Sequence, residues 1–561
     1  MFKRVNLRVL VAGVMLILFL IANRAAYKGF FHGDDLDNLA WNHFVGVDTY
    51  VHGLFTPIFD RSNFRPVGHS LFFLMGRYAG LHFEPYVVVI QIIHLVNAVL
   101  VWFLLRRMQV PDLAAFGATL FFVFHPATFA AHWQPMYIFD LLCGTFSILC
   151  LTFFVQRRWV LSFVCFWLAY KAKEIGIMLP AVLCLYEFMF GERRWKPLVP
   201  FFLVSLMFGS QALMRNAASH DAYTLKFSPR IALHVASFYG ERLFAGWAGF
   251  AAVAIVALAV ARSRRALWGI LSAFIVAIPL IALPNRMFAV YLYVPVVFMA
   301  IGISAILSWR PQIVVPVFAL LWILATYYQL RGYRSEYLAA SQENKRYVQQ
   351  VARFVQSSPG TMDFVVDGFP PTLFDYGIVG SVKFLTGEPS TEVTNIESPD
   401  AKRVLEKPDV GVLVWNSATR QLNITSRNPA TADATFVRMD TGIPVWQLGE
   451  GWFTRDGSFR WTSPVAEANL YRPVTARKFE VQVNVGPQQI RDIKQLRLRV
   501  FLDRELLGTA EFDKPGWQTA SWPVESGPQK LVQIRFESDP AYRTPLDPRV
   551  LGSAIGAFGF R

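Results

Sequence analysis

The sequence predicts a polytopic α-helical membrane protein followed by a soluble C-terminal region, on three observations. The 561-residue chain is 54% hydrophobic and 15% aromatic, and its mean hydropathy of +0.36 is too high for a soluble domain of this length. Apolar runs of roughly 20 residues, the length that crosses a bilayer, recur before residue 330. Beyond that point the hydropathy drops and strand-like alternation begins.

The apolar runs predict about eleven spans. The first follows Lys3, Arg4 and Arg8 and has no small-residue cleavage site, so we expect a retained signal anchor. Between the first two spans, residues 49–81 are expected to include helices on the membrane surface. The predicted spans are residues 9–22, 85–105, 113–124, 137–155, 160–170, 175–190, 198–213, 231–260, 267–283, 288–306 and 313–330.

Basic clusters agree with this topology, because Lys and Arg are enriched on the cytoplasmic side of membrane proteins. The clusters that fall on the same side as Lys3 and Arg4 are Arg106-Arg107, Arg157-Arg158, Arg193-Arg194 with Lys196, Arg262 with Arg264-Arg265, and Arg310. The loop after the first span and the whole C-terminal region then lie on the opposite, non-cytoplasmic face. Since Lys and Arg form short clusters instead of one basic face, the net charge of +15 does not indicate nucleic-acid binding.

The soluble region is predicted to have two parts, residues 331–450 and 451–561. Helical spacing at residues 347–356 and strand-like runs at 363–367 and 411–415 predict a small α/β part. Alternation at residues 479–485, 496–502 and 532–536 predicts an antiparallel, jelly-roll-like β-sandwich. Its tryptophans either stack on sugar rings or lie in the core; they are Trp452, Trp461, Trp517 and Trp522. All four cysteines, Cys143, Cys150, Cys165 and Cys184, fall in predicted spans, so no disulfide is expected in this region.

An acidic cluster directly after the first span is the main candidate site. It contains Asp34, Asp35 and Asp37, and ionisable groups at a membrane boundary are costly unless they are used or paired. Solvated loop charges are the alternative, which is favoured for Asp37. His32 and Asp34 could ligate a divalent ion, but no tight ligand spacing supports a metal, and no other cofactor is indicated.

Cationic residues on the same predicted face complete a minimal reaction site. A carboxylate base activates an acceptor hydroxyl, while cations hold the leaving phosphate of a lipid-linked sugar, and direct attack would invert the anomeric carbon. The candidate cations are Arg65, Lys171, Lys173 and Arg286. Their alternatives are snorkelling to the interface or, for Arg65, pairing with an acid. Glu174 lies between two apolar runs and needs a partner.

Several motifs occur in an order that resembles a known family. They are Asp34-Asp35, Asn63-Phe64-Arg65-Pro66-Val67, Phe124-His125-Pro126 through Asp140, Tyr170-Lys171-Ala172-Lys173-Glu174 through Leu185-Tyr186-Glu187, and Arg286 with Tyr291-Leu292-Tyr293-Val294-Pro295. Over roughly residues 5–330 they resemble the membrane part of the tetratricopeptide-containing O-mannosyltransferases and their bacterial relatives. These are C-type glycosyltransferases (GT-C), which use polyprenyl-phosphate sugars. The tail differs, since a β-rich region stands in place of tetratricopeptide repeats.

The resemblance implies a glycosyltransferase of a bacterial inner membrane with Asp34 or Asp35 as the catalytic base. Asp34 is favoured because it matches the first acid of the family's paired motif. The donor would be a polyprenyl-phosphate sugar, with mannose as the sugar, and the acceptor a protein, glycan or lipid hydroxyl. The expected substrate-binding residues are Arg65, Lys171, Lys173, Glu174, Arg286, Tyr293, His125 and His132. For the two histidines, helix capping or loop packing is the alternative.

Two other classes of function stay open from the residues alone. A transporter or flippase of lipid-linked sugars would show paired half-repeats and ionisable groups near the bilayer midplane. Here no repeat is visible, and the ionisable groups collect at one predicted interface. A non-catalytic membrane protein that displays a carbohydrate-binding sandwich is the third class.

Overall fold

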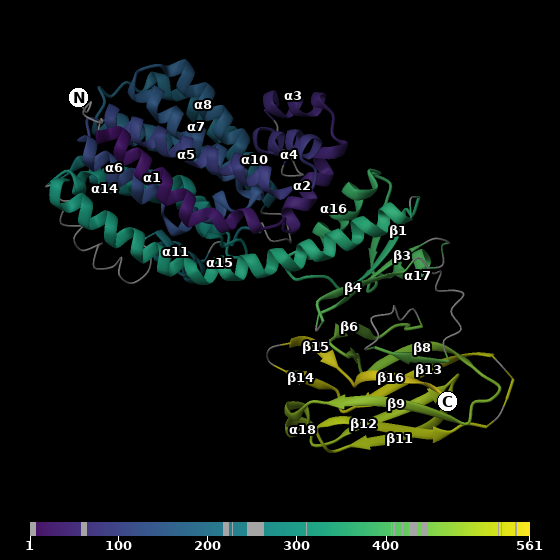
Figure 1. The fold of residues 1–561 in the computed structure, drawn as a ribbon. Helices are drawn as coiled ribbons and strands as arrows, with labels where there is room; N and C mark the ends of the chain where they lie inside the picture. Colours follow the sequence, from purple (N-terminus) through teal and green to yellow (C-terminus); the bar gives the residue numbers. More distant parts are fainter. Residues whose placement is uncertain are drawn as a thin grey trace, which may run out of the picture. The chain divides into compact units, whose positions relative to one another are not determined.

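The computed structural model shows two compact units, Met1–Gln342 and Glu343–Arg561 (Figure 1). The expected boundary after residue 330 falls inside one continuous helix, α15 (Pro311–Ser357), which ends only in the second unit. The structure describes residues 7–57, 64–216, 224–226, 228–243, 263–309, 311–358, 360–405, 407, 410–417, 419–425, 435–439, 447–525, 527–528, 530–544 and 547–561.

The described part of the first unit is helical. Its helices are α1 (Leu7–Asn23), α2 (Gly33–Phe44), α3 (Val47–Phe55), α4 (Pro66–Tyr78), α5 (Phe83–Arg107), α6 (Asp112–Val123), α7 (Ile138–Val155), α8 (Trp159–Ala172), α9 (Leu179–Met189), α10 (Val199–Asn216), α11 (Pro229–Leu243), α13 (Arg264–Ala277) and α14 (Tyr293–Leu307), with the first part of α15. Figure 1 shows α2, α3 and α4 grouped at one end of the bundle. α3 and α4 correspond to the helices expected within residues 49–81, whereas α2 lies before that stretch.

Seven helical segments in the described residues are long and apolar enough to cross a membrane, which confirms a polytopic protein. They are Val9–Lys28, Phe83–Arg107, Pro135–Val155, Lys196–Met214, Arg264–Ala282, Ala289–Leu307 and Pro311–Ser357. Three of the predicted spans fall short of this length in the described residues. Two are the shorter apolar helices α6 and α8, and the third is α9 with 11 residues. The predicted span 231–260 begins within α11, and its residues 244–260 lie outside the described part.

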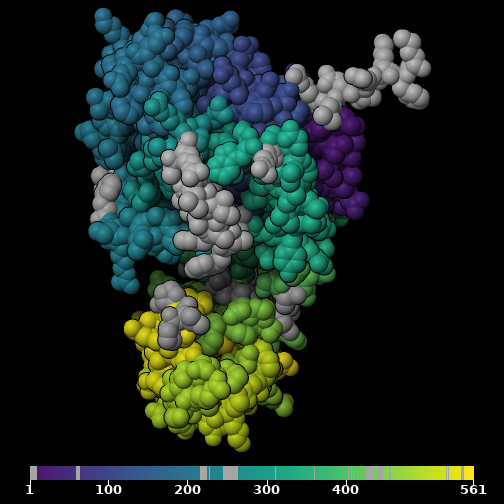
Figure 2. All heavy atoms as spheres, turned by 90° about the vertical axis from the view of Figure 1, so that its left-hand side faces the viewer, coloured from purple at the N-terminus to yellow at the C-terminus, as the bar shows by residue number. Residues whose placement is uncertain are grey.

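Burial separates an inner helix from outer helices in this bundle. In α14, 78% of the most apolar window is buried, against 17% in the segment that contains α1. The apolar side chains of Val9, Ile17 and Ile21 are largely exposed, and Figure 2 shows α1, in purple, at the edge of the unit. Exposed apolar side chains on a spanning helix are expected where lipid is the surrounding solvent.

The α/β part of the second unit is a four-stranded sheet in the order β2-β1-β3-β4. β1 (Asp363–Asp367) lies parallel to β2 (Glu392–Asn395) and β3 (Gly411–Asn416), and β3 pairs with β4 (Gln421–Thr425) in antiparallel fashion. Helices α16 (Phe374–Thr386) and α17 (Ala401–Leu405) connect the strands. Parallel pairing explains why β1 and β3 are continuous apolar runs, since both faces of such strands are covered.

The remaining strands form a β-sandwich, as predicted. One sheet has the order β11-β10-β13-β8, and the other β12-β9-β16-β7-β6 with β5 paired to β16. The strands are β5 (Phe436–Arg438), β6 (Trp452–Asp456), β7 (Phe459–Thr462), β8 (Val465–Arg472), β9 (Lys478–Val485), β10 (Leu496–Leu502), β11 (Glu505–Phe512), β12 (Gly516–Pro523), β13 (Lys530–Asp539) and β16 (Ala554–Phe560). The helix α18 (Pro487–Ile493) and the hairpin of β14 (Tyr542–Thr544) and β15 (Asp547–Leu551) complete this part.

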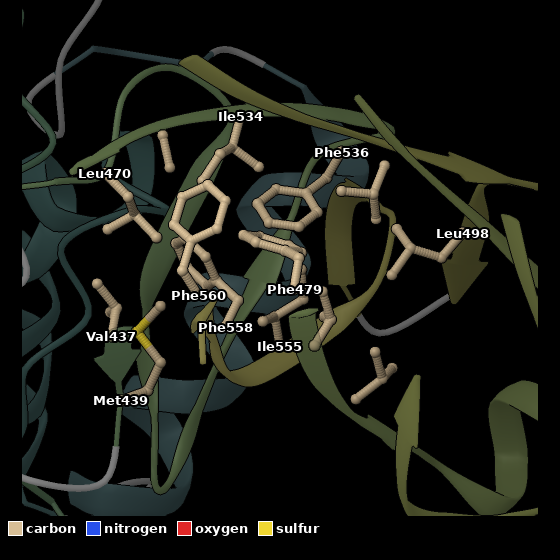
Figure 3. Packing of buried hydrophobic residues seen from close by; sticks show 14 of the residues in the cluster. Val437, Met439, Leu470, Phe479, Leu498, Ile534, Phe536, Ile555, Phe558 and Phe560 are labelled. Carbon is tan, nitrogen blue, oxygen red and sulfur yellow. The ribbon is translucent and has the colours of Figure 1, made fainter. Parts of the chain in front are cut away.

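Alternating side chains build the sandwich core. In β9 every second residue from Phe479 to Val485 is buried, and the residues between them are only partly buried. Phe536 of the facing sheet packs against Phe558 of β16, with ring centroids 5.0 Å apart, and Phe479 packs against Phe560 of β16, with centroids 5.1 Å apart. Figure 3 shows these side chains in the sandwich core. Strand β5 lies before residue 451, so the sandwich begins earlier in the chain than expected.

Candidate active site

Asp35 anchors the start of α2. One carboxylate oxygen, Oδ2, accepts a hydrogen bond from the His32 backbone N–H at 2.8 Å, and the other, Oδ1, accepts one from the Met136 N–H at 2.6 Å. The side chain is fully buried. Met136 lies in the 3₁₀ turn η4 (Pro135–Tyr137) that precedes α7. Because backbone donors occupy both oxygens, Asp35 ties two distant segments together, which is a positioning role.

Burial controls the ionisation of this end of α2. It raises the pKa of Asp35 to about 7, and the neighbouring Asp34 adds to this, although the two backbone hydrogen bonds act in the opposite direction. Burial also lowers the pKa of His32 to about 4. Both groups therefore favour their neutral forms more than they would in water.

Asp34 occupies a different environment from Asp35. It lies in the first turn of α2 with a partly exposed side chain, and its backbone carbonyl accepts a hydrogen bond from the Asn38 amide at 2.6 Å. The positive end of the helix dipole favours a carboxylate at this position. Asp37, one turn further on, is exposed. Of the pair, Asp34 is therefore the carboxylate that an incoming molecule can reach.

Two ion pairs form a compact charged network beside α7. The Lys173 ammonium lies 2.6 Å from both oxygens of Asp140, and Arg65 Nε lies 2.7 Å from Glu174 Oε1. Asp140 also interacts electrostatically with Arg65 and Glu174, so the two pairs act on each other. The predicted need of Glu174 for a partner is confirmed, and the partner is Arg65. Arg65 thus pairs with an acid, which was the alternative to phosphate binding given for it above.

Aromatic residues connect this network to the acidic cluster. The Lys173 ammonium lies 4.1 Å from the centroid of the Tyr291 ring. Tyr137, next to Met136, interacts electrostatically with Tyr291, Asp140, Asp34 and Asp35. Tyr137 therefore lies within electrostatic range of the acidic cluster, of Asp140 in the ion-pair network and of Tyr291 before α14.

Arg286 lies shortly before Tyr291 in the chain. Its backbone carbonyl accepts a hydrogen bond from the Tyr239 hydroxyl at 3.3 Å, and its guanidinium lies 5.8 Å from the centroid of the Phe288 ring. Tyr239 also interacts electrostatically with Asp140. These contacts place the Arg286 segment next to the ion-pair network.

Lys171 does not join Lys173. Its ammonium donates a hydrogen bond to the Thr56 carbonyl at 2.8 Å and lies 5.2 Å and 5.4 Å from the Trp167 and Phe208 ring centroids. The side chain is buried, with 6% exposed. The two lysines, both candidate cations for the donor phosphate, therefore have different surroundings, and Lys171 fastens the end of α3 to α8.

Both predicted histidines make packing contacts. His125 accepts a hydrogen bond from the Ala127 N–H at 3.2 Å, which caps the 3₁₀ turn η2 (Pro126–Thr128), and its Nε2 lies 3.1 Å from the Leu243 carbonyl. This is the helix-capping alternative. His132 is buried and stacks on His94, with ring centroids 4.7 Å apart. Neither contact reaches the acidic cluster.

Tyr293 lies in a buried polar group inside the bundle. Its hydroxyl lies 2.9 Å from His94 Nδ1 and accepts a hydrogen bond from the Asn97 amide at 3.0 Å. Thr145 donates to Asn97 in turn, at 2.7 Å. Such a group satisfies polar side chains that would otherwise be costly inside a span. Tyr293 therefore positions the start of α14 from within the bundle.

Three residues of the site were not among the sequence-predicted ones. Asp140 and Tyr291 appear in the sequence analysis only as the ends of motifs, and Tyr137 does not appear there as a candidate. The signal for Asp140 was available, because a carboxylate at the start of an apolar run requires a partner. The aromatic residues carry no comparable signal, since tyrosine is common at membrane interfaces.

An apolar pocket of about 440 Å³ lies elsewhere in the unit, against α9 and α10. It is lined by Cys184, Trp195, Leu198, Val199, Phe202, Leu203 and Leu206, and it contains none of the predicted site residues. Within the part of the chain that the structure describes, no group of three or more His, Cys, Asp or Glu side chains could hold a metal ion.

These features define a polytopic α-helical membrane protein with a soluble α/β and β-sandwich region and a charged site at one end of the bundle. No family model and no curated protein matches the chain. Two crystal structures of ArnT from Cupriavidus metallidurans, in the apo state and bound to undecaprenyl phosphate, are similar to it. Each is 15% identical and covers 73% of this chain and 93% of its own, with TM-scores of 0.45 and 0.46.

Proposed function

We propose that the protein is a membrane glycosyltransferase of the C type. It transfers a sugar, mannose by the family resemblance, from a polyprenyl-phosphate donor to an acceptor hydroxyl on the non-cytoplasmic face. One observation carries the proposal: Tyr137 lies within electrostatic range of a partly exposed carboxylate, Asp34, and of Asp140, which belongs to the network of the Lys173–Asp140 and Arg65–Glu174 pairs. The order of the motifs in the sequence supports it independently.

Asp34 is the general base of the proposed reaction. A positioned carboxylate removes the proton of the acceptor hydroxyl as its oxygen attacks the anomeric carbon, a contribution of typically about 10²- to 10⁴-fold. Direct attack breaks the bond between that carbon and the phosphate oxygen, and the configuration is inverted. Asp35 takes no proton from the acceptor, because its two oxygens hold α2 against η4.

Cations stabilise the departing polyprenyl phosphate. Arg286 offers a planar fork of donors that suits phosphate oxygens, and its segment neighbours the ion-pair network. Lys173 and Arg65 are each paired with a carboxylate, so the network is electrically balanced before the donor binds. We assign Arg286 as the principal phosphate clamp and the network as the wall that orients it.

The proposal is tested with the full-length protein in proteoliposomes and a panel of labelled polyprenyl-phosphate sugars. Asp34→Asn is compared with Asp37→Asn, a matched substitution of an exposed residue on the same helix. We expect Asp34→Asn to lower kcat by about 10²- to 10⁴-fold, with the midpoint of thermal unfolding unchanged, and Asp37→Asn to stay close to the wild type.

Two results would count against this function. If no donor of the panel loses its label to an acceptor, the protein is not this kind of enzyme. If Asp34→Asn is as active as Asp37→Asn and the wild type, the protein can still be a transferase, but Asp34 is not its general base. The proposed role of the acidic cluster is then wrong.

A further inference from the structure

Trp517 forms a platform on the outer face of the sheet β12-β9-β16-β7-β6. Its side chain is 52% exposed, whereas Trp452 and Trp522 pack against the sandwich core. A Cβ atom at Gly556 of β16 would lie 2.4 Å from the Trp517 ring. Since β9 separates β12 from β16, the ring reaches over about two strand spacings, roughly 9–10 Å, and must extend along the sheet.

The platform is held in one orientation. Gly556 leaves the space that the indole fills, and the Phe459 ring packs edge-on against it with centroids 6.2 Å apart. One side of the ring is thus fixed on the sheet, while the other faces solvent. A rigid aromatic surface loses little conformational freedom when a ligand stacks on it.

Neutral polar side chains surround the platform. Asn484 is the register partner of Trp517, and Gln482 is the register partner of Thr519. Among the described residues, the side chains of these three polar neighbours form no hydrogen bond with the protein. Further along the face, Glu480 forms ion pairs with both Lys478 and Arg561, which leaves one positive charge there. The exposed Arg438 is the register partner of Ala557. The register partners of Trp517 and Thr519 are therefore neutral amides, and the charged groups lie further across the face.

A second aromatic group lies in the same cross-strand row. Trp461 pairs with Ala554, and Ala554 pairs with Asn484, which itself pairs with Trp517. The row spans three strand spacings, about 14 Å, and Trp461 stacks with Tyr542 at its far end, with centroids 6.5 Å apart. Because the side chain of Ala554 is small, the surface is shallow between the two aromatic groups.

We infer that this face binds a neutral carbohydrate chain. The apolar C–H face of a sugar ring stacks on the exposed side of Trp517, and its hydroxyls exchange hydrogen bonds with Asn484, Gln482 and Thr519. The neutral amides and hydroxyl beside the ring match an uncharged polyol, and a single ring among polar groups is too small for a stable protein interface. The inference does not depend on the proposed transferase activity.

The test uses full-length protein in nanodiscs and calorimetric titration with neutral hexaoses built from glucose, mannose or N-acetylglucosamine. We expect at least one hexaose to bind, and Trp517→Ala to weaken its binding about tenfold or more. Leu531→Ala is the matched control, because Leu531 is a similarly exposed side chain on the other sheet. It should bind as the wild type does. Asn484→Ala, which leaves the ring in place, should weaken binding by a smaller factor.

Three results would overturn the inference. Binding of no hexaose at millimolar concentration, or equal binding by Trp517→Ala and the wild type, removes the site. If Trp517→Ala instead abolishes self-association in sedimentation or the binding of phospholipid vesicles, the platform serves that contact and not a sugar. Since the titrations need no donor, they are independent of whether transferase activity is found.

Discussion

The ammonium of Lys173 lies 2.6 Å from both carboxylate oxygens of Asp140, although the two residues are 33 positions apart in the chain. Both side chains are largely buried, with 12% and 4% exposed. A buried charge that loses its partner is strongly destabilising, whereas removal of both charges is much better tolerated. This pair therefore allows its structural and catalytic roles to be separated.

We predict that Asp140→Asn and Lys173→Met each destabilise the protein by about 3–5 kcal/mol, and that the double variant recovers most of this loss. The measurement is the thermal unfolding of the purified protein in detergent. If the effects of the two single variants simply add in the double variant, the residues are not coupled as the structure shows.

Lys171 and Lys173 are predicted to differ in their effects on the donor. Lys171→Met removes the contact with the Thr56 carbonyl, so it should lower thermal stability while KM for the polyprenyl-phosphate donor stays within about twofold. Lys173→Met in the Asp140→Asn background should change KM or kcat without a comparable loss of stability. Steady-state kinetics with a fixed acceptor distinguish the two. Equal changes in donor KM would mean that both lysines contact the donor.

The pH dependence of stability should report on Asp35. Its pKa is raised from 3.8 to about 7 in the folded protein, so the folded state keeps its proton where the unfolded state has lost it. The contribution of Asp35 to stability is therefore greatest near pH 4, falls as pH rises to about 7, and then stays constant.

The comparison of the wild type with Asp35→Asn isolates this contribution. The stability of the wild type relative to the variant should increase as pH is lowered from 7 to 4, measured by thermal unfolding. His32, with its pKa lowered to about 4, acts in the opposite direction, but it is present in both proteins and largely cancels. A difference that does not change with pH would contradict the raised pKa.

A second buried pair provides a prediction for the soluble unit. Arg460 of β7 forms an ion pair with Asp367 at the end of β1, and only 4% of each side chain is exposed. Asp367→Asn or Arg460→Met should destabilise this unit by about 3–5 kcal/mol. Limited proteolysis should show faster cleavage after residue 343 in each single variant and a slower rate in the double variant. Unchanged cleavage in the single variants would show that the pair contributes little.

The regular elements were largely predictable from local patterns. The predicted strand 363–367 matches β1, and the alternation at 479–485 and 496–502 recovers β9 and β10. Period-two burial leaves a mark on the sequence wherever one face of a strand is covered. The continuity of α15 was not predictable, because its apolar first half and polar second half resemble two separate helices.

Most charged residues of the candidate site could be predicted from the sequence, but which residue pairs with which could not. The need of Glu174 for a partner follows from its apolar neighbours, yet Arg65 is 109 residues away and nothing local identifies it. The divergence of Lys171 and Lys173 arises where α8 ends, since Lys171 lies in its last turn and Lys173 is the extended residue that follows it. No local signal predicts that both oxygens of Asp35 accept hydrogen bonds, because the second donor is the backbone N–H of Met136 in a distant turn.

The hydrogen bond between Asp35 and the Met136 N–H also has a consequence for folding during synthesis. The two residues are 101 positions apart, and a ribosome that adds about 5–20 residues per second needs about 5–20 s to cover that stretch. During that interval the carboxylate has been synthesised while its second donor does not yet exist. The mature geometry around α2 is therefore completed only after the third predicted span and Met136 have been synthesised, directly before the fourth predicted span.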